Sequence, residues 1–352
     1  MNLLFLTQLF YPHVGGVEKH VFEIAKKLKN SPELLKKVNA SEGIKIKILT
    51  TGFNKNLKDK EIINGIEIYR FYQPKIKYFG LVYTWFWIFK NINLIIQSDI
   101  VHIHDVFIWY LPFRFLFPRK KVYITFHGWE GKYPISWVSI LQKKIANKFS
   151  YGSIAVGKYI NKYYGIKANI ITYGAVNVYG GSFKKEKENI ILFVGRLDKN
   201  TLLPVFLKML KNFSEFFIKF KLKVEFCGDG ELRKFCEKYG RVYGWHNPEN
   251  LFKKAKYVFG PGYLTTLEAL SYRCLVFSVY KNPIQRDIFR TSPFKKYIFL
   301  TNDPIKITQK IEFYEKNPKM RKIIAERGFK WVKNQTWEAL ERKYLKLWEN
   351  RI

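Results

Sequence analysis

The sequence predicts an α/β protein with two Rossmann-like, doubly wound domains that face each other across a cleft. Short apolar runs alternate with helical segments almost from the first residue, and each of these runs ends in glycine or polar residues. The pattern restarts after residues 180–188. A chain of 352 residues is also too long for one ordinary core, so two domains are expected.

The first half opens on a strand followed by a helix. Residues 2–8 predict the strand, and residues 15–29 predict a helix whose apolar face consists of Val17, Val21, Ile24, Ala25 and Leu28. Further strands are predicted at residues 44–51, 100–105, 122–128 and 151–157. This alternation is typical of a parallel sheet, in which functional loops lie at the carboxyl ends of the strands.

The second half repeats the pattern after a linker. Residues 180–188, GGSFKKEKE, have the glycine, serine and charge content of a linker, and strands are predicted at residues 189–200, 222–231, 240–250, 255–263 and 274–280. A closing helix is predicted from the helical spacing of Trp337, Leu340, Tyr344 and Leu347. We therefore expect an N-terminal domain at 1–180, a C-terminal domain at 181–330 and a closing helical segment at 331–352.

Composition limits the compartment and the partners. Hydrophobic residues make up 47% of the chain, which excludes a disordered protein. The three cysteines, at 227, 236 and 274, fit neither a disulfide framework nor a CxxC metal motif, so a reducing, cytoplasmic setting is expected. The net charge of +34 suits a solvated lysine surface or attraction to an anionic partner, either a membrane face or nucleic acid.

No segment is expected to cross a membrane. The N-terminal apolar run meets Pro12 too early for a signal peptide and fits a buried strand better. The longest apolar stretch, residues 78–96, is interrupted by Lys90, Asn91 and Asn93. Any membrane contact is therefore expected to be peripheral.

Two glycine-rich turns precede predicted helices. Gly15 and Gly16 follow the first strand, where free N–H groups at a positive helix end suit a phosphate, although a purely structural turn is the commoner explanation of such a glycine pair. The stretch GPGYLTTLEAL repeats this arrangement after Gly262, with Thr265 as the expected helix cap. Glu268 lies about one turn into that helix, where it suits a neutral diol such as ribose or is an ordinary surface acid.

Arg196 and three histidines are the remaining candidates. Arg196 follows a predicted strand of the second half, where its guanidinium either neutralises a diphosphate or lies on the surface. His102 and His104 share one face of a strand, and His127 ends the next strand. No carboxylate or cysteine completes a zinc site with them, so we expect hydrogen-bonding histidines, with His127 as the substrate contact.

The ordered motifs GGVEKH, VHIHD, TFHG, FVGRLD, CGDGE, VYGW and GYLTTLEAL resemble those of the retaining glycosyltransferases of family 4, over nearly the whole chain. This resemblance implies the GT-B fold and a nucleoside diphosphate sugar as donor, bound mostly by the C-terminal domain without a metal ion. The absence of a DxD sequence agrees with metal independence. The resemblance implies no cofactor and suggests a hexosyltransferase, for which UDP- and GDP-linked sugars are the candidate donors.

The resemblance also implies roles for individual residues. The amides of Gly15 and Gly16 would meet the donor diphosphate, which Arg196 would also bind. His127 would contact the donor sugar near the reacting centre, and Glu268 would bind the ribose hydroxyls. A front-face retaining mechanism is then expected, in which the stabilised leaving diphosphate helps to deprotonate the acceptor hydroxyl.

Two positions depart from the family pattern. Gly260 stands where the first acid of the E-x7-E motif is expected, and Thr201 stands where a lysine is usual. The missing acid leaves the sugar to the amides of Tyr263 and Leu264 or to another side chain, and Lys199 is the nearby lysine. The expected donor-binding set is Gly15, Gly16, Arg196, Lys199, Thr201, Gly262, Tyr263, Leu264, Thr265 and Glu268.

Large aromatic residues alternate with lysine and arginine in residues 75–90 and 107–121 of the N-terminal half, where GT-B enzymes bind acceptors. These residues are expected either to pack in the core or to lie in the bilayer interface with their cations on anionic lipid. We expect a peripheral protein of the inner membrane face and a lipid-linked or membrane-proximal acceptor.

Three other functions remain open from the sequence. Another GT-B activity, such as a sugar phosphorylase or a sucrose-phosphate-type synthase, would act on soluble acceptors. A catalytically silent GT-B protein that binds a nucleotide sugar or assists an active subunit is consistent with Gly260 and Thr201. Nucleic-acid binding rests on charge alone, and arginine, the usual base reader, is scarce.

Overall fold

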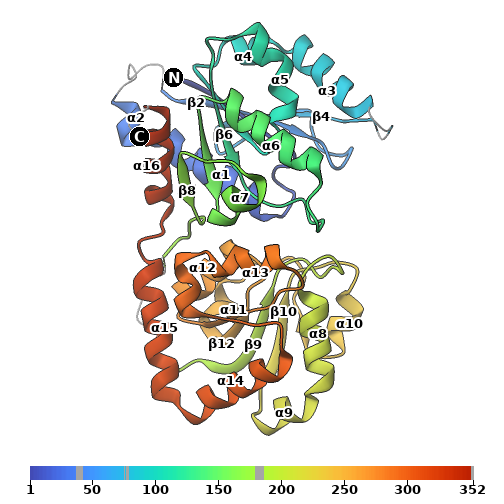
Figure 1. The fold of residues 1–352 in the computed structure, drawn as a ribbon, viewed down its shortest axis with the longest axis vertical. Coiled ribbons are helices and arrows are strands. Elements are labelled where there is room, and N and C mark those ends of the chain that lie inside the picture. The colour runs from blue at the N-terminus through green and yellow to red at the C-terminus, as the bar shows by residue number, and fades with distance from the viewer. Residues whose placement is uncertain (37–42, 75, 77–78, 179–185, 350–352) are drawn as a thin grey trace. The chain divides into compact units, whose positions relative to one another are not determined.

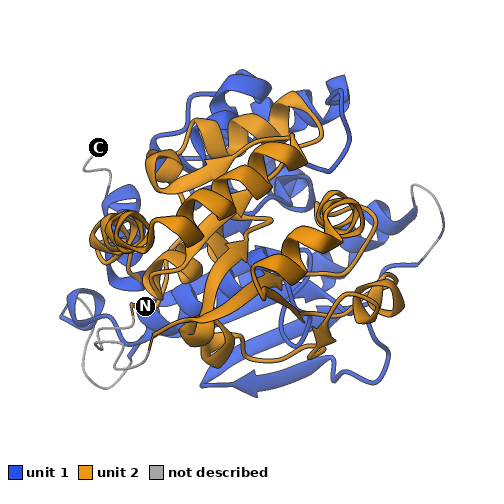
Figure 2. Cartoon of the chain, turned by 90° about the horizontal axis from the view of Figure 1, so that it is seen from below, with its two compact units in different colours: residues 1–172, 337–352 blue, residues 173–336 orange. Residues whose placement is uncertain are grey.

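The computed structural model describes residues 1–36, 43–74, 76, 79–178 and 186–349, which form two compact α/β units (Figures 1 and 2). Unit 1 comprises residues 1–172 and 337–352, and unit 2 comprises residues 173–336. Residues 180–185 of the predicted linker lie outside the described residues, and its last residue, Glu188, already begins a strand. The prediction of a two-domain α/β protein is confirmed.

Unit 1 contains an eight-stranded sheet in the order β3-β4-β2-β1-β5-β6-β7-β8. Its strands are parallel except for the β3–β4 pair at one edge. The strands are β1 (Asn2–Thr7), β2 (Lys45–Thr51), β3 (Lys60–Ile63), β4 (Ile66–Phe71), β5 (Ile100–His104), β6 (Lys121–Phe126), β7 (Gly152–Val156) and β8 (Ile170–Thr172). The central strands β1 and β5 are almost wholly buried, as expected for a parallel sheet that helices cover on both faces.

The helices of unit 1 include α1, whose apolar face buries Val21, Ile24, Ala25 and Leu28 as predicted, while Val17 is only half-buried. The helices are α1 (Gly16–Lys29), α2 (Pro32–Leu35), α3 (Phe79–Lys90), α4 (Asn93–Ile96), α5 (Phe107–Leu116), α6 (Trp137–Phe149), α7 (Lys158–Tyr164) and α16 (Trp337–Trp348). Among the residues that the structure describes, no helix has both the length and the hydrophobicity to cross a bilayer.

The closing helix α16 belongs to unit 1, where buried hydrogen bonds attach it to the sheet. Trp348 Nε1 donates to His102 Nδ1 (3.0 Å), and Tyr123 Oη donates to the carbonyl of Trp348 (3.1 Å). Tyr344 Oη lies 3.0 Å from Thr125 Oγ1. Residues up to 336 stay with unit 2, so the units divide at 172 and 336, whereas the sequence predicted divisions at 180 and 330.

Unit 2 contains a wholly parallel six-stranded sheet in the order β11-β10-β9-β12-β13-β14. The strands are β9 (Glu188–Val194), β10 (Lys223–Cys227), β11 (Arg241–Val242), β12 (Ala255–Phe259), β13 (Leu275–Ser278) and β14 (Ile298–Leu300). In the central pair, Val258 of β12 lies opposite Leu192 of β9. Every strand that the sequence predicted in this half is present.

Helices cover both faces of the unit 2 sheet and form two cores. One core includes Phe193, Phe206 and Phe259, and the other includes Leu192, Val258 and Leu267. The helices are α8 (Leu203–Asn212), α9 (Ser214–Lys219), α10 (Arg233–Glu237), α11 (Glu249–Lys254), α12 (Tyr263–Ser271), α13 (Pro283–Arg290), the 3-10 helix η1 (Pro293–Tyr297), α14 (Pro304–Lys316) and α15 (Pro318–Val332). Phe193 and Leu192 are neighbours in β9, so alternate residues of that strand supply the two cores.

Each sheet has a topological switch point near its centre. In unit 1 the chain runs from β1 to β2 in one direction and from β5 to β6 in the other. In unit 2 it runs from β9 to β10 in one direction and from β12 to β13 in the other. Ligands of doubly wound sheets bind at the carboxyl ends of the strands beside such a switch point. The candidate loops are therefore those after β1 and β5 in unit 1, and after β9 and β12 in unit 2.

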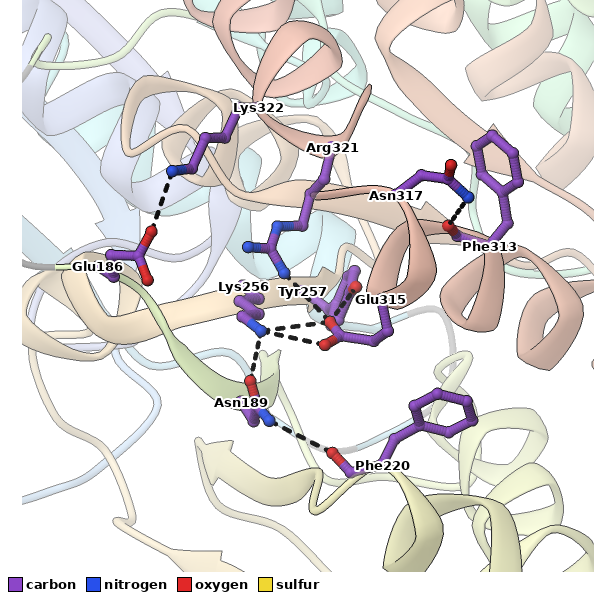
Figure 3. Close-up of polar contacts among 10 residues, drawn as sticks. All are labelled: Glu186, Asn189, Phe220, Lys256, Tyr257, Phe313, Glu315, Asn317, Arg321 and Lys322. Atoms are coloured by element: carbon purple, nitrogen blue, oxygen red, sulfur yellow. Dashed lines mark hydrogen bonds and ion pairs between the residues drawn. The ribbon is translucent and has the colours of Figure 1, made fainter. Parts of the chain in front are cut away.

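A polar cluster joins two helices of unit 2 to the sheet at the opposite, amino ends of β9 and β12 (Figure 3). Glu315 of α14 accepts hydrogen bonds from Tyr257 Oη (2.5 Å), Lys256 Nζ (3.1 Å) and Arg321 Nη1 (3.2 Å). Lys256 also donates to Asn189. Burial and the Glu315 carboxylate raise the pKa of Tyr257, so this hydroxyl keeps its proton and donates it. The cluster is structural, because it lies at the edge away from the candidate loops.

We expect Glu315→Ala to lower the free energy of unfolding by about 3 kcal/mol, because it leaves two largely buried cations without their common carboxylate. Glu312→Ala, one turn earlier, removes a more exposed carboxylate that pairs with Lys316 and should change stability little. Urea unfolding of the full chain measures both variants. Equal stability of the two variants would contradict a stabilising role for the cluster.

Candidate functional site

The loop after β9 carries Arg196 at the switch point of unit 2. Its side chain is 60% exposed, and its only ion pair within the described residues is a loose one, 3.7 Å from Nε to Asp198 Oδ2. The guanidinium is therefore accessible to a ligand. Arginine suits a diphosphate because its planar group donates several hydrogen bonds in a fixed fork.

The loop after β12 leads into α12, whose N-cap is Gly262 in an extended conformation without a side-chain cap. The prediction that Thr265 caps this helix is wrong, because Thr265 is already its third residue. The neighbouring hydroxyl, Thr266 Oγ1, donates to the Gly262 carbonyl (2.9 Å) and caps no N–H group. The first N–H groups of an α-helix lack intrahelical acceptors, so those of Tyr263 and Leu264 suit an anionic ligand.

The structure explains why glycine stands at position 260. A Cβ atom there would lie 2.8 Å from Thr266 Oγ1 and 3.2 Å from Val276 Cγ1. A glutamate at this position would have to displace both side chains. Thr266 of α12 and Val276 of β13 therefore occupy the space that an acidic side chain at position 260 would need.

Two lysines lie close to Asp198 and Thr201 in this region, and the sequence singled out only one of them, Lys199. Lys199 Nζ lies 3.7 Å from Glu231 Oε2, and Thr201 Oγ1 donates to the Asp198 carbonyl (2.7 Å). Lys281, which follows β13, places its Nζ 3.0 Å from the Thr201 carbonyl. Sequence reasoning missed Lys281, because only the sheet order brings the β13 end close to residue 201. A positive charge is thus present beside Thr201 without a lysine at that position.

The start of α1, in unit 1, differs from that of α12. Gly15 is the N-cap, but the Glu18 carboxylate lies against it, since a Cβ on Gly15 would collide with Glu18 Oε2. Glu18 Oε1 also contacts His13 Nδ1 at 2.6 Å. A carboxylate in the first turn already complements the positive helix end. A phosphate at Gly15 and Gly16 would meet this negative charge, so α12 is the more favourable anion site.

Four histidines gather at the carboxyl half of β5 and β6 and at α1. His104 Nδ1 lies 2.8 Å from His127 Nε2, and His20 packs edge-on against His127. Burial lowers the pKa of His20, His102 and His104 well below the ordinary range. Burial, and then the charge of Lys143, lowers the pKa of His127 to about 3, so these rings are neutral at pH 7.

The histidines bond to each other and to hydroxyl or indole groups, as expected. His102 Nδ1 accepts from Trp348, so its proton lies on Nε2 and is donated to Thr125 Oγ1 (2.8 Å). In the part of the chain that the structure describes, no group of three or more His, Cys, Asp or Glu residues is arranged to hold a metal ion.

Sequence reasoning also missed three charged residues next to His127. The His127 amide donates to Asp105 Oδ1 (3.0 Å), and Lys143 Nζ lies 3.0 Å from Glu130 Oε1. The sequence offered one signal for this charged cluster, because Asp105 stands at the end of the VHIHD motif. Lys143 lies within α6, and no motif in the sequence of that helix distinguishes it from the other lysines.

Two doubly wound units, each with its candidate loops at a central switch point, define the GT-B class of fold. Residues 14–173 match the family model described as Glycosyltransferase Family 4, and residues 180–331 match the model described as Glycosyl transferases group 1. The chain therefore belongs to the family 4, group 1 glycosyltransferases.

Solved structures show the same fold at low sequence identity. The sucrose-phosphate synthase of Thermosynechococcus elongatus superposes with a TM-score of 0.73 at 14% identity, covering 99% of this chain and 98% of that one. HepE of Anabaena, solved with UDP and glucose, gives a TM-score of 0.67 at 12% identity and covers 98% of both chains. The GT-B prediction is confirmed.

A curated relative resembles part of the chain. The phosphatidylinositol N-acetylglucosaminyltransferase GPI3 subunit of Saccharomyces cerevisiae is 29% identical over 106 residues. The match covers 29% of this chain and only 21% of that protein.

Proposed function

We propose that this glycosyltransferase moves a hexose from a UDP- or GDP-linked sugar to a hydroxyl of a lipid-linked or membrane-proximal glycan, with retention of anomeric configuration and without a metal ion. The observation that carries the proposal is the uncapped start of α12 and the exposed Arg196 at one switch point, in a chain of this family. The HepE complex with UDP and glucose supports a nucleotide-sugar donor, and the name of the GPI3 relative supports a lipid acceptor.

The proposed roles follow the physical chemistry of each group. Arg196 and the first amides of α12 stabilise the negative charge that develops on the leaving diphosphate, with Lys281 and Lys199 adding positive charge nearby. Glu268, on α12, accepts hydrogen bonds from the ribose hydroxyls. The leaving phosphate then takes the proton of the attacking acceptor hydroxyl on the same face of the sugar.

His127 is proposed to contact the transferred sugar as a neutral hydrogen-bonding group. Its pKa of about 3 means that it cannot supply a positive charge near pH 7. The protein therefore contributes positioning through His127 and electrostatic stabilisation through Arg196, and its own carboxylates form no covalent intermediate with the sugar.

Release of nucleoside diphosphate from a panel of UDP- and GDP-sugars, with a bacterial lipid extract as acceptor, tests the reaction. We expect turnover with one donor, in the presence of EDTA, and a product whose anomeric configuration by NMR equals that of the donor. An inverted product would contradict the retaining mechanism. Nucleotide binding without turnover would favour the silent GT-B alternative, which the absence of an acid at position 260 keeps open.

Exposed apolar side chains on three helices of unit 1 support the membrane proposal. Figure 1 shows α3, α5 and α6 as neighbours in unit 1. Their exposed residues, together called the apolar patch, are Phe79, Val82, Phe86, Phe89, Phe115, Leu116, Trp137, Val138 and Leu141. Other aromatics of the same segments, such as Trp109 and Tyr110, are buried, so core packing accounts for only part of the aromatic content. Residues 75, 77 and 78 of the predicted segment lie outside the described residues.

We expect the protein to float with liposomes that contain anionic lipid at low salt, because the apolar patch inserts and the net positive charge adds attraction. The triple variant Phe79→Ser, Phe86→Ser, Phe89→Ser should remain in the dense fractions. Phe235→Ser, an equally exposed phenylalanine of unit 2, is the control and should float like the unaltered protein. Flotation of the triple variant would contradict insertion through α3.

A further inference from the structure

The switch point of unit 1 contains a cavity of about 470 Å³, and His127 is the one residue of its lining that the proposed function uses. Gln8, Asp105 and His127, which follow β1, β5 and β6, line it together with α5 and α6. This volume lies within the range of small-molecule sites. The cavity belongs wholly to unit 1, so its chemistry can be read from that unit alone.

Among the described residues, three charged side chains line the cavity, and their charges sum to −1. Lys143 is only 7% exposed, and its Nζ lies 3.6 Å from Asp105 Oδ1 and 3.0 Å from Glu130 Oε1. Tyr164 Oη donates to the other Glu130 oxygen, Oε2, at 2.5 Å. His127 adds no charge near pH 7 because its pKa is lowered. A negative cavity in a chain of net charge +34 is unfavourable for a phosphate, however basic the rest of the protein is.

Asp105 lines the cavity and has a left-handed backbone conformation. Its φ is +61°, in the left-handed region that few residues other than glycine adopt. Such strain persists where the surrounding structure requires it, and it concentrates at functional sites. Among the described residues, the Asp105 carboxylate contacts the His127 amide and Lys143 through Oδ1, which leaves Oδ2 for a ligand. Burial raises the pKa of this carboxyl.

The remaining walls are aromatic and apolar, including Phe107, Trp109 and Phe126. A ligand that matches this lining needs hydroxyls that donate to the carboxylates, an oxygen that accepts from Lys143, and a C–H face for the apolar wall. A ring with neighbouring hydroxyls has all three features, and a phosphorylated ring adds a charge that Asp105 and Glu130 repel.

We propose that this cavity binds an uncharged cyclic polyol, a sugar or inositol ring, through Asp105, Lys143 and Glu130, and that this ring is the acceptor unit. The assignment of the ring as acceptor rests on the proposed function, whereas the binding chemistry rests on the cavity alone. Any phosphate of a lipid-linked acceptor must then lie outside the cavity.

Saturation-transfer NMR on the full chain tests the proposal with three ligands: methyl α-D-glucopyranoside, myo-inositol and glucose 6-phosphate. We expect signal for at least one uncharged ring, with or without UDP or GDP, and a much weaker signal for the phosphorylated ring. Asp105→Asn keeps the shape and tolerates positive φ, so it should fold normally. It should weaken binding of the uncharged ring by at least ~10-fold and reduce the discrimination against glucose 6-phosphate.

Glu130→Gln is a second variant with the same expected loss of discrimination, and Asp59→Asn, an exposed aspartate of unit 1, is the matched control. A role of Asp105 in folding alone would leave the ratio of uncharged to phosphorylated binding unchanged. Absence of signal for both uncharged rings, or tighter binding of glucose 6-phosphate, would overturn the proposal. Nucleotide binding without polyol binding would refute only this inference, and polyol binding without nucleotide binding would refute the proposed transferase.

Discussion

Arg196→Ala is expected to lower kcat by about 10²- to 10³-fold while the fold stays intact. Removing one preorganised donor that stabilises transition-state charge typically has an effect of this size. Arg196 is well exposed and makes one loose ion pair in the described chain, so its loss removes no packing from the core of unit 2. Steady-state release of nucleoside diphosphate measures turnover, and circular dichroism checks the fold.

Two further variants make the Arg196 result specific. Arg196→Lys keeps the charge but not the planar fork, so we expect a turnover between that of the alanine variant and the unaltered enzyme. Arg241→Ala, which removes an exposed arginine of the edge strand β11, should leave turnover unchanged. Near-normal turnover of Arg196→Ala would contradict a role in stabilising the diphosphate.

Glu268→Ala is expected to weaken nucleotide binding by roughly 10- to 100-fold, because each hydrogen bond from a ribose hydroxyl to a carboxylate contributes about 1.5–3 kcal/mol. The position of Glu268 on α12, beyond its uncapped start, suits a ribose next to a bound diphosphate. Isothermal titration of the preferred nucleotide measures the affinity. The 2′,3′-dideoxy analogue provides the specific test, since it lacks both hydroxyls.

The unaltered protein should prefer the ribonucleotide to the dideoxy analogue, and Glu268→Ala should bind the two about equally. Glu249→Ala, which removes a partly exposed acid of unit 2 that pairs with Lys253, should keep the preference. If Glu268→Ala still distinguishes the two nucleotides, another residue holds the ribose.

The fold could be predicted because hydrophobic periodicity is local. Apolar runs such as NLLFLT and the one-sided apolar spacing of α1 reveal their elements without knowledge of the rest of the chain. The helix spacing of α16 was equally clear, but spacing says only that one face is buried and not which core buries it. Buried hydrogen bonds to His102 and Thr125 settle that α16 belongs to unit 1.

The candidate site could be predicted only where its residues form motifs along the chain. Arg196 and Glu268 stand in such motifs. Lys281 approaches Thr201 because β13 lies two strands from β9 in the sheet, and strand order is not local information. The prediction that Thr265 caps α12 was wrong because Gly262, three residues earlier, is the N-cap. The positive φ of Asp105 is likewise a property of the folded turn, because aspartate tolerates this conformation but does not require it.

A thermal-shift screen of the purified full chain against UDP, GDP, ADP and their sugar conjugates tests the donor site most directly, since a ligand that binds only the folded state raises the unfolding temperature. We expect one nucleotide to stabilise the protein, by about 2.7 kcal/mol at a hundredfold excess over its Kd, and Glu268→Ala to lose most of this shift. No shift with any of these nucleotides, with or without anionic vesicles, would contradict the proposal that unit 2 binds a nucleoside diphosphate sugar.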